Sequence, residues 1–369
     1  MGQQQRSVTE WSGRATRGVV AAVAVLLLVL VAGTAEAAGP RAGGTPAVRT
    51  VAPGESVQAA VDAAAPGDVV ELSAGTYHGS VLIAKDGITL RGPRDGEAVI
   101  SPAASAEEGV CATGGFGVCV FGTAQKPVVR VGVESLTVTG FRKTGVKGLH
   151  ADGLSVTAVH ARGNGEHGIG QEFSVRGRFV GNVTESNGQS GLFVGDEPDG
   201  TGTVVVGNRA ADNRIGVHLR RARHITVSGN RLTDNCAGVF VVGDETRPIA
   251  GDLDIVGNAM AANNRFCPGN ERIAHIQGSG IVLTGTEGVR IRGNSITDHH
   301  GDSPMSGGIV MVPSFTGEGT SRQEITGNTV VRNVPADLAQ RDPRGVGNTY
   351  AANTCLKSEP ADLCGPQAG

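Results

Sequence analysis

The chain has 369 residues, of which 58 are glycine and only 3% are aromatic, and its formal net charge is -3. A globular α/β enzyme of this size packs more aromatic rings, whereas a coil of short Val, Ile and Leu strands needs frequent glycine turns and few rings. The absence of a basic excess argues against nucleic acid as a partner.

Residues 1–37 have the pattern of a secretory signal peptide. Arg14 and Arg17 form a positive flank, residues 19–32 an apolar run, and residues 35–37 read Ala-Glu-Ala, an A-x-A cleavage site. The apolar run is short for a membrane span. We therefore expect a secreted, extracellular or cell-surface protein with no stable membrane insertion after cleavage. An uncleaved anchor is the alternative.

Residues 38–50 contain Pro and Gly and are expected to form a linker. Residues 55–65 have the apolar spacing of a short amphipathic helix, which Pro66 and Gly67 end. A strand pattern begins at Val69. Because a coil of parallel strands has an open apolar end, we expect this helix to cap it.

The residues after the linker resemble the beginning of a known fold. These are Ser-Val-Gln-Ala-Ala-Val at 56–61, Pro-Gly-Asp at 66–68, Gly-Thr-Tyr at 75–77 and Ile-Thr-Leu-Arg-Gly at 88–92. They resemble a pectin-lyase-like right-handed parallel β-helix, and the body resembles exported bacterial proteins with parallel β-helix repeats. The resemblance implies an all-β solenoid. It implies no single activity, because this superfamily holds polysaccharide lyases, epimerases, glycosidases, adhesins and copper-site maturation proteins.

A repeat in the body predicts the same fold without reference to a family. Its unit is a Gly-Asn pair, a polar residue five positions after that Asn, and a Gly that opens a short apolar strand. Asn and Gly tolerate the left-handed backbone of sharp turns, and stacked Asn side chains can hydrogen-bond between coils about 4.8 Å apart. The Asn residues of the pairs are Asn182, Asn208, Asn230, Asn258, Asn294 and Asn328, and the second positions are Asn187, Asn213, Asn235, Asn263, His299 and Asn333. We place the β-helix at residues 51–338 and a C-terminal cap or tail at 339–369.

Six cysteines in an exported chain indicate disulfides. Two pairs are close in sequence and the other two cysteines are left to each other, which gives the expected pairings Cys111–Cys119, Cys355–Cys364 and Cys236–Cys267. Metal binding is the alternative, but no Cys-x-x-Cys motif or clustered His accompanies these residues.

Alternation along the strands predicts which side chains point outward. We align the repeats on the Gly before each apolar strand, with Gly148 in the first and Gly168 in the second. The residues two and four positions after each Gly then form an outward patch of His150, Asp152, Glu172, His218 and Arg220, with Phe193 and Phe240 beside it. An exposed Phe favours a binding partner such as a sugar ring. A solvated strand face with mixed charges is the alternative interpretation.

Three functions fit this patch, and a polysaccharide or cell-wall glycan is the expected partner of a monomeric protein. In uronate β-elimination or C5-epimerisation, Arg220 would neutralise the carboxylate and His218 or His150 would be the base. In a retaining glycoside hydrolase, Asp152 and Glu172 would be the two carboxylates, about 5 Å apart on adjacent coils. The third function is binding without catalysis, as in a cell-surface or periplasmic-type maturation protein. The epimerase motif built on Tyr, Asp, Pro and His is absent, so the resemblance assigns no catalytic residue.

No cofactor is expected, although calcium is conceivable. Its ligands would be Asp196, Glu197 and Asp199, or Asp244 and Glu245. Arg221 aligns between Asp196 and Asp244, which favours a ladder of ion pairs over a calcium site.

Overall fold

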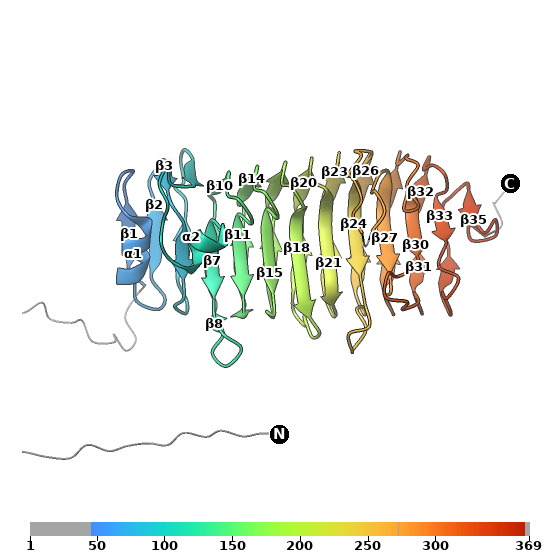
Figure 1. Cartoon of the computed structure of the whole chain (residues 1–369), viewed down its shortest axis with the longest axis horizontal. Coiled ribbons are helices and arrows are strands. Elements are labelled where there is room, and N and C mark those ends of the chain that lie inside the picture. The colour runs from blue at the N-terminus through green and yellow to red at the C-terminus, as the bar shows by residue number, and fades with distance from the viewer. Residues whose placement is uncertain (1–45, 272, 366–369) are drawn as a thin grey trace, which may run out of the picture. The chain divides into compact units, whose positions relative to one another are not determined.

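The structure, a computed structural model, describes residues 46–271 and 273–365. Three parallel sheets run the length of this part of the chain, and each coil contributes strands to them in turn (Figure 1). This is the predicted parallel β-helix. The predicted signal peptide lies outside the described residues, as does most of the predicted linker.

The first sheet has 12 strands within the described residues and the second has 10. Those of the first are β1 (Val48–Val51), β2 (Val69–Leu72), β5 (Thr89–Arg91), β9 (Gly132–Glu134), β13 (Ser155–Thr157), β16 (Arg178–Val180), β19 (Val204–Val206), β22 (Thr226–Ser228), β25 (Asp254–Val256), β28 (Arg290–Arg292), β31 (Glu324–Thr326) and β34 (Thr349–Ala351). Those of the second are β3 (Gly75–His78), β6 (Ala98–Ser101), β10 (Thr137–Thr139), β14 (His160–Arg162), β17 (Val183–Glu185), β20 (Arg209–Ala211), β23 (Arg231–Thr233), β26 (Ala259–Ala261), β29 (Ser295–Thr297) and β32 (Thr329–Val331).

The third sheet has 11 strands in the described part of the chain and carries the longest ones. They are β4 (Val81–Ile83), β7 (Val118–Phe121), β11 (Val146–Leu149), β15 (Ile169–Glu172), β18 (Ser190–Glu197), β21 (Ile215–Ala222), β24 (Ala237–Val242), β27 (Ser279–Thr284), β30 (Gly307–Val312), β33 (Leu338–Gln340) and β35 (Ser358–Glu359). A further small sheet pairs β8 (Val128–Val129) with β12 (Ala151–Asp152).

The predicted N-terminal helix is α1 (Val57–Ala63). Ser56 caps it, with its hydroxyl oxygen accepting a hydrogen bond from the Ala59 N–H at 3.1 Å. Val57 and Val61 are buried in the same core that the coils form, so the helix covers the end of the apolar interior. A second short helix, α2 (Val110–Gly114), lies in the insertion between β6 and β7.

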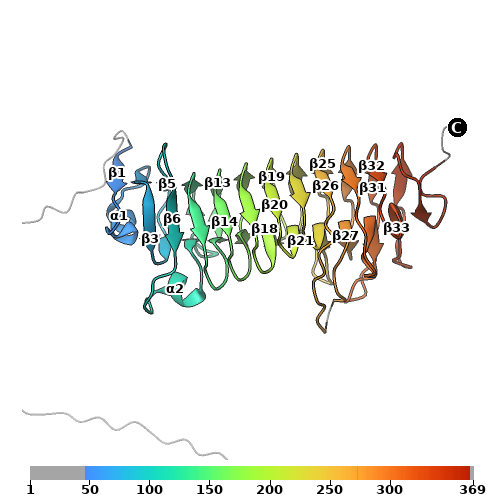
Figure 2. The ribbon, with the colours of Figure 1, turned by 90° about the horizontal axis from the view of Figure 1, so that it is seen from above.

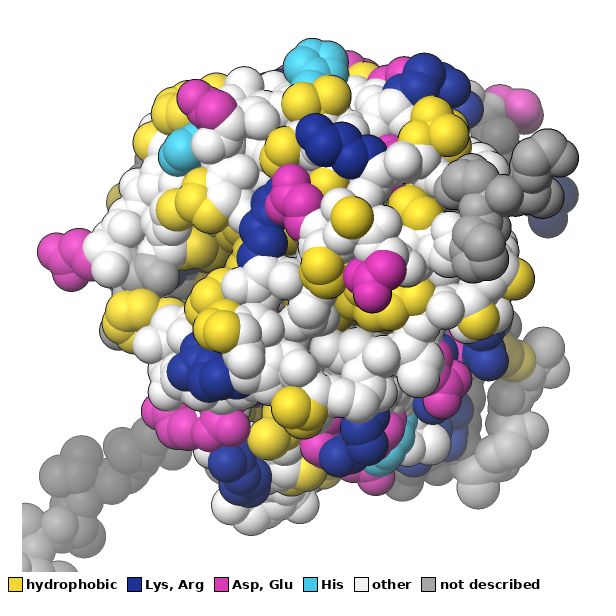
Figure 3. All heavy atoms as spheres, turned by 90° about the vertical axis from the view of Figure 1, so that its right-hand side faces the viewer, with side chains coloured by type: hydrophobic (Ala, Val, Ile, Leu, Met, Phe, Trp, Pro, Cys, Tyr) yellow, Lys and Arg dark blue, Asp and Glu magenta, His cyan; other side chains and the backbone are white. Residues whose placement is uncertain are grey.

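The ends of the coil differ from the predicted boundaries. Strand β1 begins at Val48, inside the stretch expected to be a linker, and pairs with β2. At the other end, β34 and β35 continue the first and third sheets through the stretch expected to be a cap or tail. Figure 3 views the C-terminal end, where apolar and charged side chains are intermixed.

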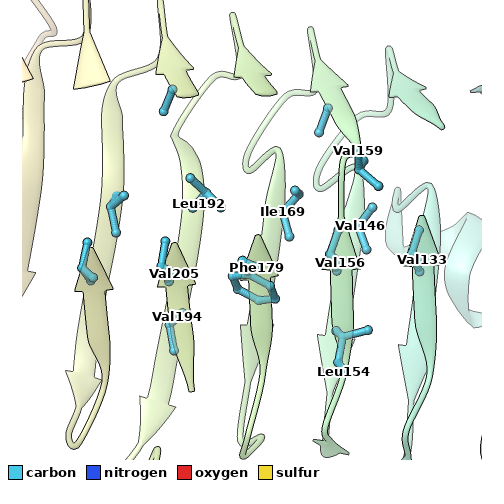
Figure 4. Packing of buried hydrophobic residues seen from close by; sticks show 14 of the residues in the cluster. Val133, Val146, Leu154, Val156, Val159, Ile169, Phe179, Leu192, Val194 and Val205 are labelled. Atoms are coloured by element: carbon cyan, nitrogen blue, oxygen red, sulfur yellow. The ribbon is translucent and has the colours of Figure 1, made fainter. Parts of the chain in front are cut away.

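The core is a column of aliphatic side chains enclosed by the three sheets. Figure 4 shows how successive coils stack residues such as Val156, Phe179 and Val205, all of which are fully buried. Each coil covers the apolar side chains of its neighbours, so burial of this column drives folding along the whole length.

Two stacks of Asn side chains hold the turns between the sheets. In the first, each side-chain N–H from Asn182 to Asn328 donates to the side-chain oxygen of the next Asn at 2.8–3.0 Å, ending at Asn353. In the second, His299 takes one position, contacting Asn263 and Asn333 through its two ring nitrogens at 2.9 Å. Gly229 precedes one ladder Asn at φ +62 with open space around it, so backbone conformation is what requires Gly there. The predicted role of the Asn residues is confirmed.

All three predicted disulfides are formed: Cys111–Cys119, Cys236–Cys267 and Cys355–Cys364. Such bonds are typical of oxidising compartments. Within the described residues, no helix has both the length and the apolar character needed to cross a membrane.

Replacing one ladder residue tests this account of the fold. In Asn230→Ala, the buried donors of Asn208 lose their acceptor, and Val205 and Asn258 lose a donor. We expect a loss of about 2–4 kcal/mol in unfolding free energy, measured by urea denaturation. Arg231→Ala, at the exposed neighbouring position, is the control and should unfold as wild type. An Asn230→Ala protein of unchanged stability would contradict the role of the ladder.

Candidate functional site

The outward face of the third sheet carries the predicted aromatic column. Phe193 pairs in register with His218, and His218 pairs with Phe240. The column continues as Val282 and Val310, which are fully buried although they point away from the core. Insertion loops cover this later part of the face, where Met305 packs on Val282 and Val310.

The rings in this column form a continuous stack. His167 lies parallel to Phe193 with ring centroids 4.4 Å apart, and the Phe193 and His218 centroids are 5.2 Å apart at an edge-on angle of 64°. His218 and Phe240 stack with centroids 6.0 Å apart. The Lys147 ammonium lies 5.9 Å from the Phe193 centroid, within cation–π range.

Gly195 makes room for this arrangement. A Cβ atom at Gly195 would lie 2.5 Å from the Phe193 ring. The ring therefore lies flat over the strand only because residue 195 has no side chain.

Two histidines of the stack are held neutral. Burial lowers the pKa of His167 and of His218 to about 3; the positive charge of Arg220 adds to the effect at His218, and at His167 so do the nearby His218 and Lys147. His218 Nδ1 lies 3.4 Å from the Ser190 hydroxyl. His218 Nε2 and His167 Nδ1 are buried and have no hydrogen-bond partner among the described residues. Because both nitrogens are buried, neither is open to solvent in this structure.

Arg220 lies beside this stack, two residues after His218 on the same face of β21. It makes no hydrogen bond or ion pair within the described part of the chain. Its near neighbours differ, because Arg221 lies between Asp196 and Asp244 and Arg223 contacts Asp252 and Glu287. A partly exposed guanidinium without a carboxylate is suited to bind an anionic group of a ligand.

Glu172 lies one column over from the stack and pairs with Lys147. Lys147 is only 7% exposed, so the carboxylate compensates its charge. The prediction missed both Lys147 and His167 as members of this face.

The predicted alignment of the first repeat is wrong by three residues. Val146 pairs with Ile169 and Leu149 pairs with Glu172, so Gly145, and not Gly148, matches Gly168. Both glycines precede an apolar residue, and the sequence offers no Asn ladder residue there to choose between them. Lys147 therefore occupies the column position expected for His150.

His150 and Asp152 consequently lie outside the site. His150 is at a turn with φ +48 and stacks on the exposed Phe173. Asp152 pairs in register with Val129 and Val175 and forms an ion pair with Arg176. It does not face Glu172, so the carboxylate pair expected for a retaining glycoside hydrolase is not formed.

Two hollows flank the ring stack along the sheet. One, of 640 Å³, lies over β11 and β15 and is lined by Lys147, His167 and Glu172 together with residues of the α2 insertion. The other, of 210 Å³, lies over β21 to β30 next to Arg220 and Phe240. Figure 2 shows α2 and the loop between β26 and β27 projecting on the same side of the solenoid. The rings of Phe193 and His218 lie between the two hollows along the sheet, and we call the two hollows together with this ring stack the groove.

Four of the five carboxylates considered for calcium, those of Asp196, Glu197, Asp199 and Asp244, have other partners. Arg221 bridges Asp196 and Asp244, the latter at 3.3 Å, as the ion-pair alternative predicted. Glu197 is buried beside Gln171, and burial raises its pKa well above the usual value. Asp199 accepts hydrogen bonds from Thr201. Among the described residues, no cluster of three His, Cys, Asp or Glu side chains is arranged to hold a metal ion.

Comparison with known proteins agrees with this architecture. The model of a family described as "Right handed beta helix region" matches residues 109–260. The chain has the right-handed parallel β-helix fold. No curated protein sequence matches it.

Several solved β-helix structures are similar to this chain. The A-module of the Azotobacter vinelandii mannuronan C-5 epimerase AlgE6 is 18% identical, with a TM-score of 0.62 over 82% of this chain and 90% of that one. The A-module of AlgE4 from the same organism is 19% identical, with a TM-score of 0.52 over 82% and 91%. An alginate lyase from a Paenibacillus species is 16% identical, with a TM-score of 0.50 over 82% and 99%. At these identities the likeness establishes the fold.

The protonation of the two stacked histidines is directly measurable. Because both pKa values are about 3, we expect the His167 and His218 ring signals in NMR to stay in the neutral form from pH 7.5 to 4.5. The unfolded chain takes up protons near pH 6.5, so these residues reduce stability as pH falls from about 6.5 towards 3. Ring signals assigned with His167→Phe and His218→Phe variants that titrated near pH 6.5 would contradict the buried, neutral state.

Proposed function

We propose that this protein acts on a uronic-acid polysaccharide by abstracting the proton next to the carboxylate, as in a lyase or a C5-epimerase. The observation that carries the proposal is the unpaired Arg220 beside His218, a neutral histidine with a free buried nitrogen. The mannuronan epimerases and the alginate lyase that share the fold, by their names, act on uronate polymers. The names of these proteins support the proposed substrate class. The positions of Arg220 and His218 in this chain support the proposed roles of those two residues.

Arg220 would bind the uronate carboxylate. A carboxylate neutralised by a guanidinium withdraws charge from the adjacent C5, which makes the C5–H bond easier to deprotonate. The carboxylate also offsets the positive charge of Arg220, which together with burial keeps the pKa of His218 low. Binding of the substrate would thus raise the basicity of His218.

His218 Nε2 would accept the C5 proton. In β-elimination the electron pair then forms the C4–C5 double bond and the C4–O bond breaks, with a proton going to the leaving oxygen. In epimerisation a proton returns to C5 from the opposite face. Lys147, on the other side of Phe193, is the nearby group able to deliver such a proton.

The Phe193 ring would pack against the apolar face of a sugar ring. The expectation of exposed rings is wrong, because Phe193 and Phe240 are only 3% and 1% exposed, so a sugar would contact only the small part of the Phe193 ring that is open. The proposal includes export of the protein from the cytoplasm, since its polysaccharide substrate would lie outside the cell. The three disulfides accord with export, because such bonds form in oxidising compartments.

A panel of uronate polymers tests this function. We expect wild-type protein to generate the ultraviolet absorbance of unsaturated ends, or a change of uronate stereochemistry in NMR, on one of them. His218→Phe keeps the ring stack but removes the base, and Arg220→Gln removes the charge. Each should lower activity by about 100-fold or more. Thermal unfolding checks that both variants remain folded.

His150→Asn is the matched control. It replaces a histidine outside the groove, at a left-handed position that Asn tolerates, and it should leave activity unchanged. If no polymer is altered but one binds in an Arg220-dependent manner, the chain is a binding protein, which was the alternative prediction. Activity that survived His218→Phe and Arg220→Gln would overturn the site.

A further inference from the structure

The hollow beside Arg220 is lined mainly by apolar side chains, which is unusual for a sugar-binding site. Its floor is the outward face of β24 to β30, with Phe240, Val242 and Val312, and its sides are loop residues Met305 and Phe315. Arg220 lies at one edge. The other charged residue of the lining, Asp244, is paired with Arg221.

This hollow is continuous with a second apolar cluster that lies outside the coil. Phe240, Val282, Val310 and Val312 pack there with Met305, beneath the insertions of the later coils. The floor is therefore mostly apolar, with the polar side chain of Thr284 between Val242 and Val312. A sugar ring buried against it would leave hydroxyl groups without partners, which is costly, whereas an apolar group would be stabilised.

The size of the hollow indicates how large that group is. Its volume is 210 Å³, and an apolar cavity of about 150 Å³ is enough to bind benzene. It therefore accommodates one aromatic ring with its linking atoms. Phe240 on the floor and Phe315 at the mouth are positioned to contact such a ring.

Phe315 gives the strongest indication of a ligand among these residues, because its large apolar side chain is 67% exposed. The loop that carries it is tied to the neighbouring loop by an ion pair between Arg247 and Glu318 at 3.0 Å. Its ring is largely exposed and lines an apolar hollow, so a ligand in the hollow would bury it.

We infer that the uronate polymer carries an aromatic acyl group in ester linkage, and that this group enters the hollow while a neighbouring carboxylate binds Arg220. This inference rests on the proposed function and deepens it by naming the substrate class. A polymer without the ester would occupy the groove from Lys147 to Arg220. The aromatic ester group would in addition occupy the hollow beyond Arg220.

Calorimetric binding to the full-length His218→Phe protein, which prevents turnover, tests the inference. The two ligands are one uronate oligosaccharide bearing a benzoyl ester and the same oligosaccharide after alkaline removal of the ester. We expect the esterified ligand to bind at least about tenfold more tightly. Adding Phe315→Ala should remove most of this preference, and Val312→Phe, which fills the hollow, should abolish it. In both, binding of the plain ligand should remain.

Phe266→Ala, added to the same His218→Phe protein, is the matched control. Phe266 is also an exposed loop Phe, at 61%, but it stacks on His275 away from the hollow, so its loss should leave the preference intact. Equal affinity for the two oligosaccharides would overturn the inference and leave the proposed function standing. Absence of binding by either, in wild type as well, would count against the proposed function itself. Benzoate alone binding as tightly as the esterified oligosaccharide would also overturn the inference, because the sugar would then contribute nothing.

Discussion

The hydrogen bonds between stacked Asn side chains are the constraint on which the rest of this structure depends. A buried amide must find partners, and here it finds them at one position of the next coil. Asn208 and Asn230 are 22 residues apart in sequence and Asn258 and Asn294 are 36 apart, yet the two bonds measure 2.9 and 3.0 Å. Coil length therefore varies freely while the register does not, and every additional residue is placed in a loop outside the stack.

That fixed register gives the outward face of the third sheet its chemistry. Side chains in one column meet even where long insertions separate them in sequence, as Phe240 and Val282 do. The insertions themselves, held by bonds such as Cys236–Cys267, then stand over the same face. A neutral histidine, an unpaired arginine and an apolar hollow come together because a regular scaffold and irregular loops meet there.

The sequence predicted the fold and part of this face for the same physical reason. Each repeat from Asn182 onward carries its own ladder residue, so the alignment of Phe193, His218 and Phe240 followed directly. The first repeat has Phe141 where the others have Asn, and its backbone N–H alone donates to Asn164. Because the first repeat lacks this Asn, the predicted alignment was wrong by three residues. It therefore assigned His150 and Asp152 to the outward patch and left out Lys147. The walls of the hollow were beyond prediction, because the conformation of the loops that carry Met305 and Phe315 follows no period.

The central claim is that Arg220 and His218 together remove the proton at C5 of a bound uronate. NMR on the polymer in deuterated buffer measures that step through the fate of the C5 proton: an epimerase replaces it with deuterium, and a lyase removes it because C5 becomes part of the double bond. We expect the wild-type protein to replace the C5 proton with deuterium or to remove it in an unsaturated product, and we expect neither change above background with His218→Phe or Arg220→Gln. Exchange that persisted in both variants, or turnover of the polymer by the wild type that left the C5 proton in place, would contradict it.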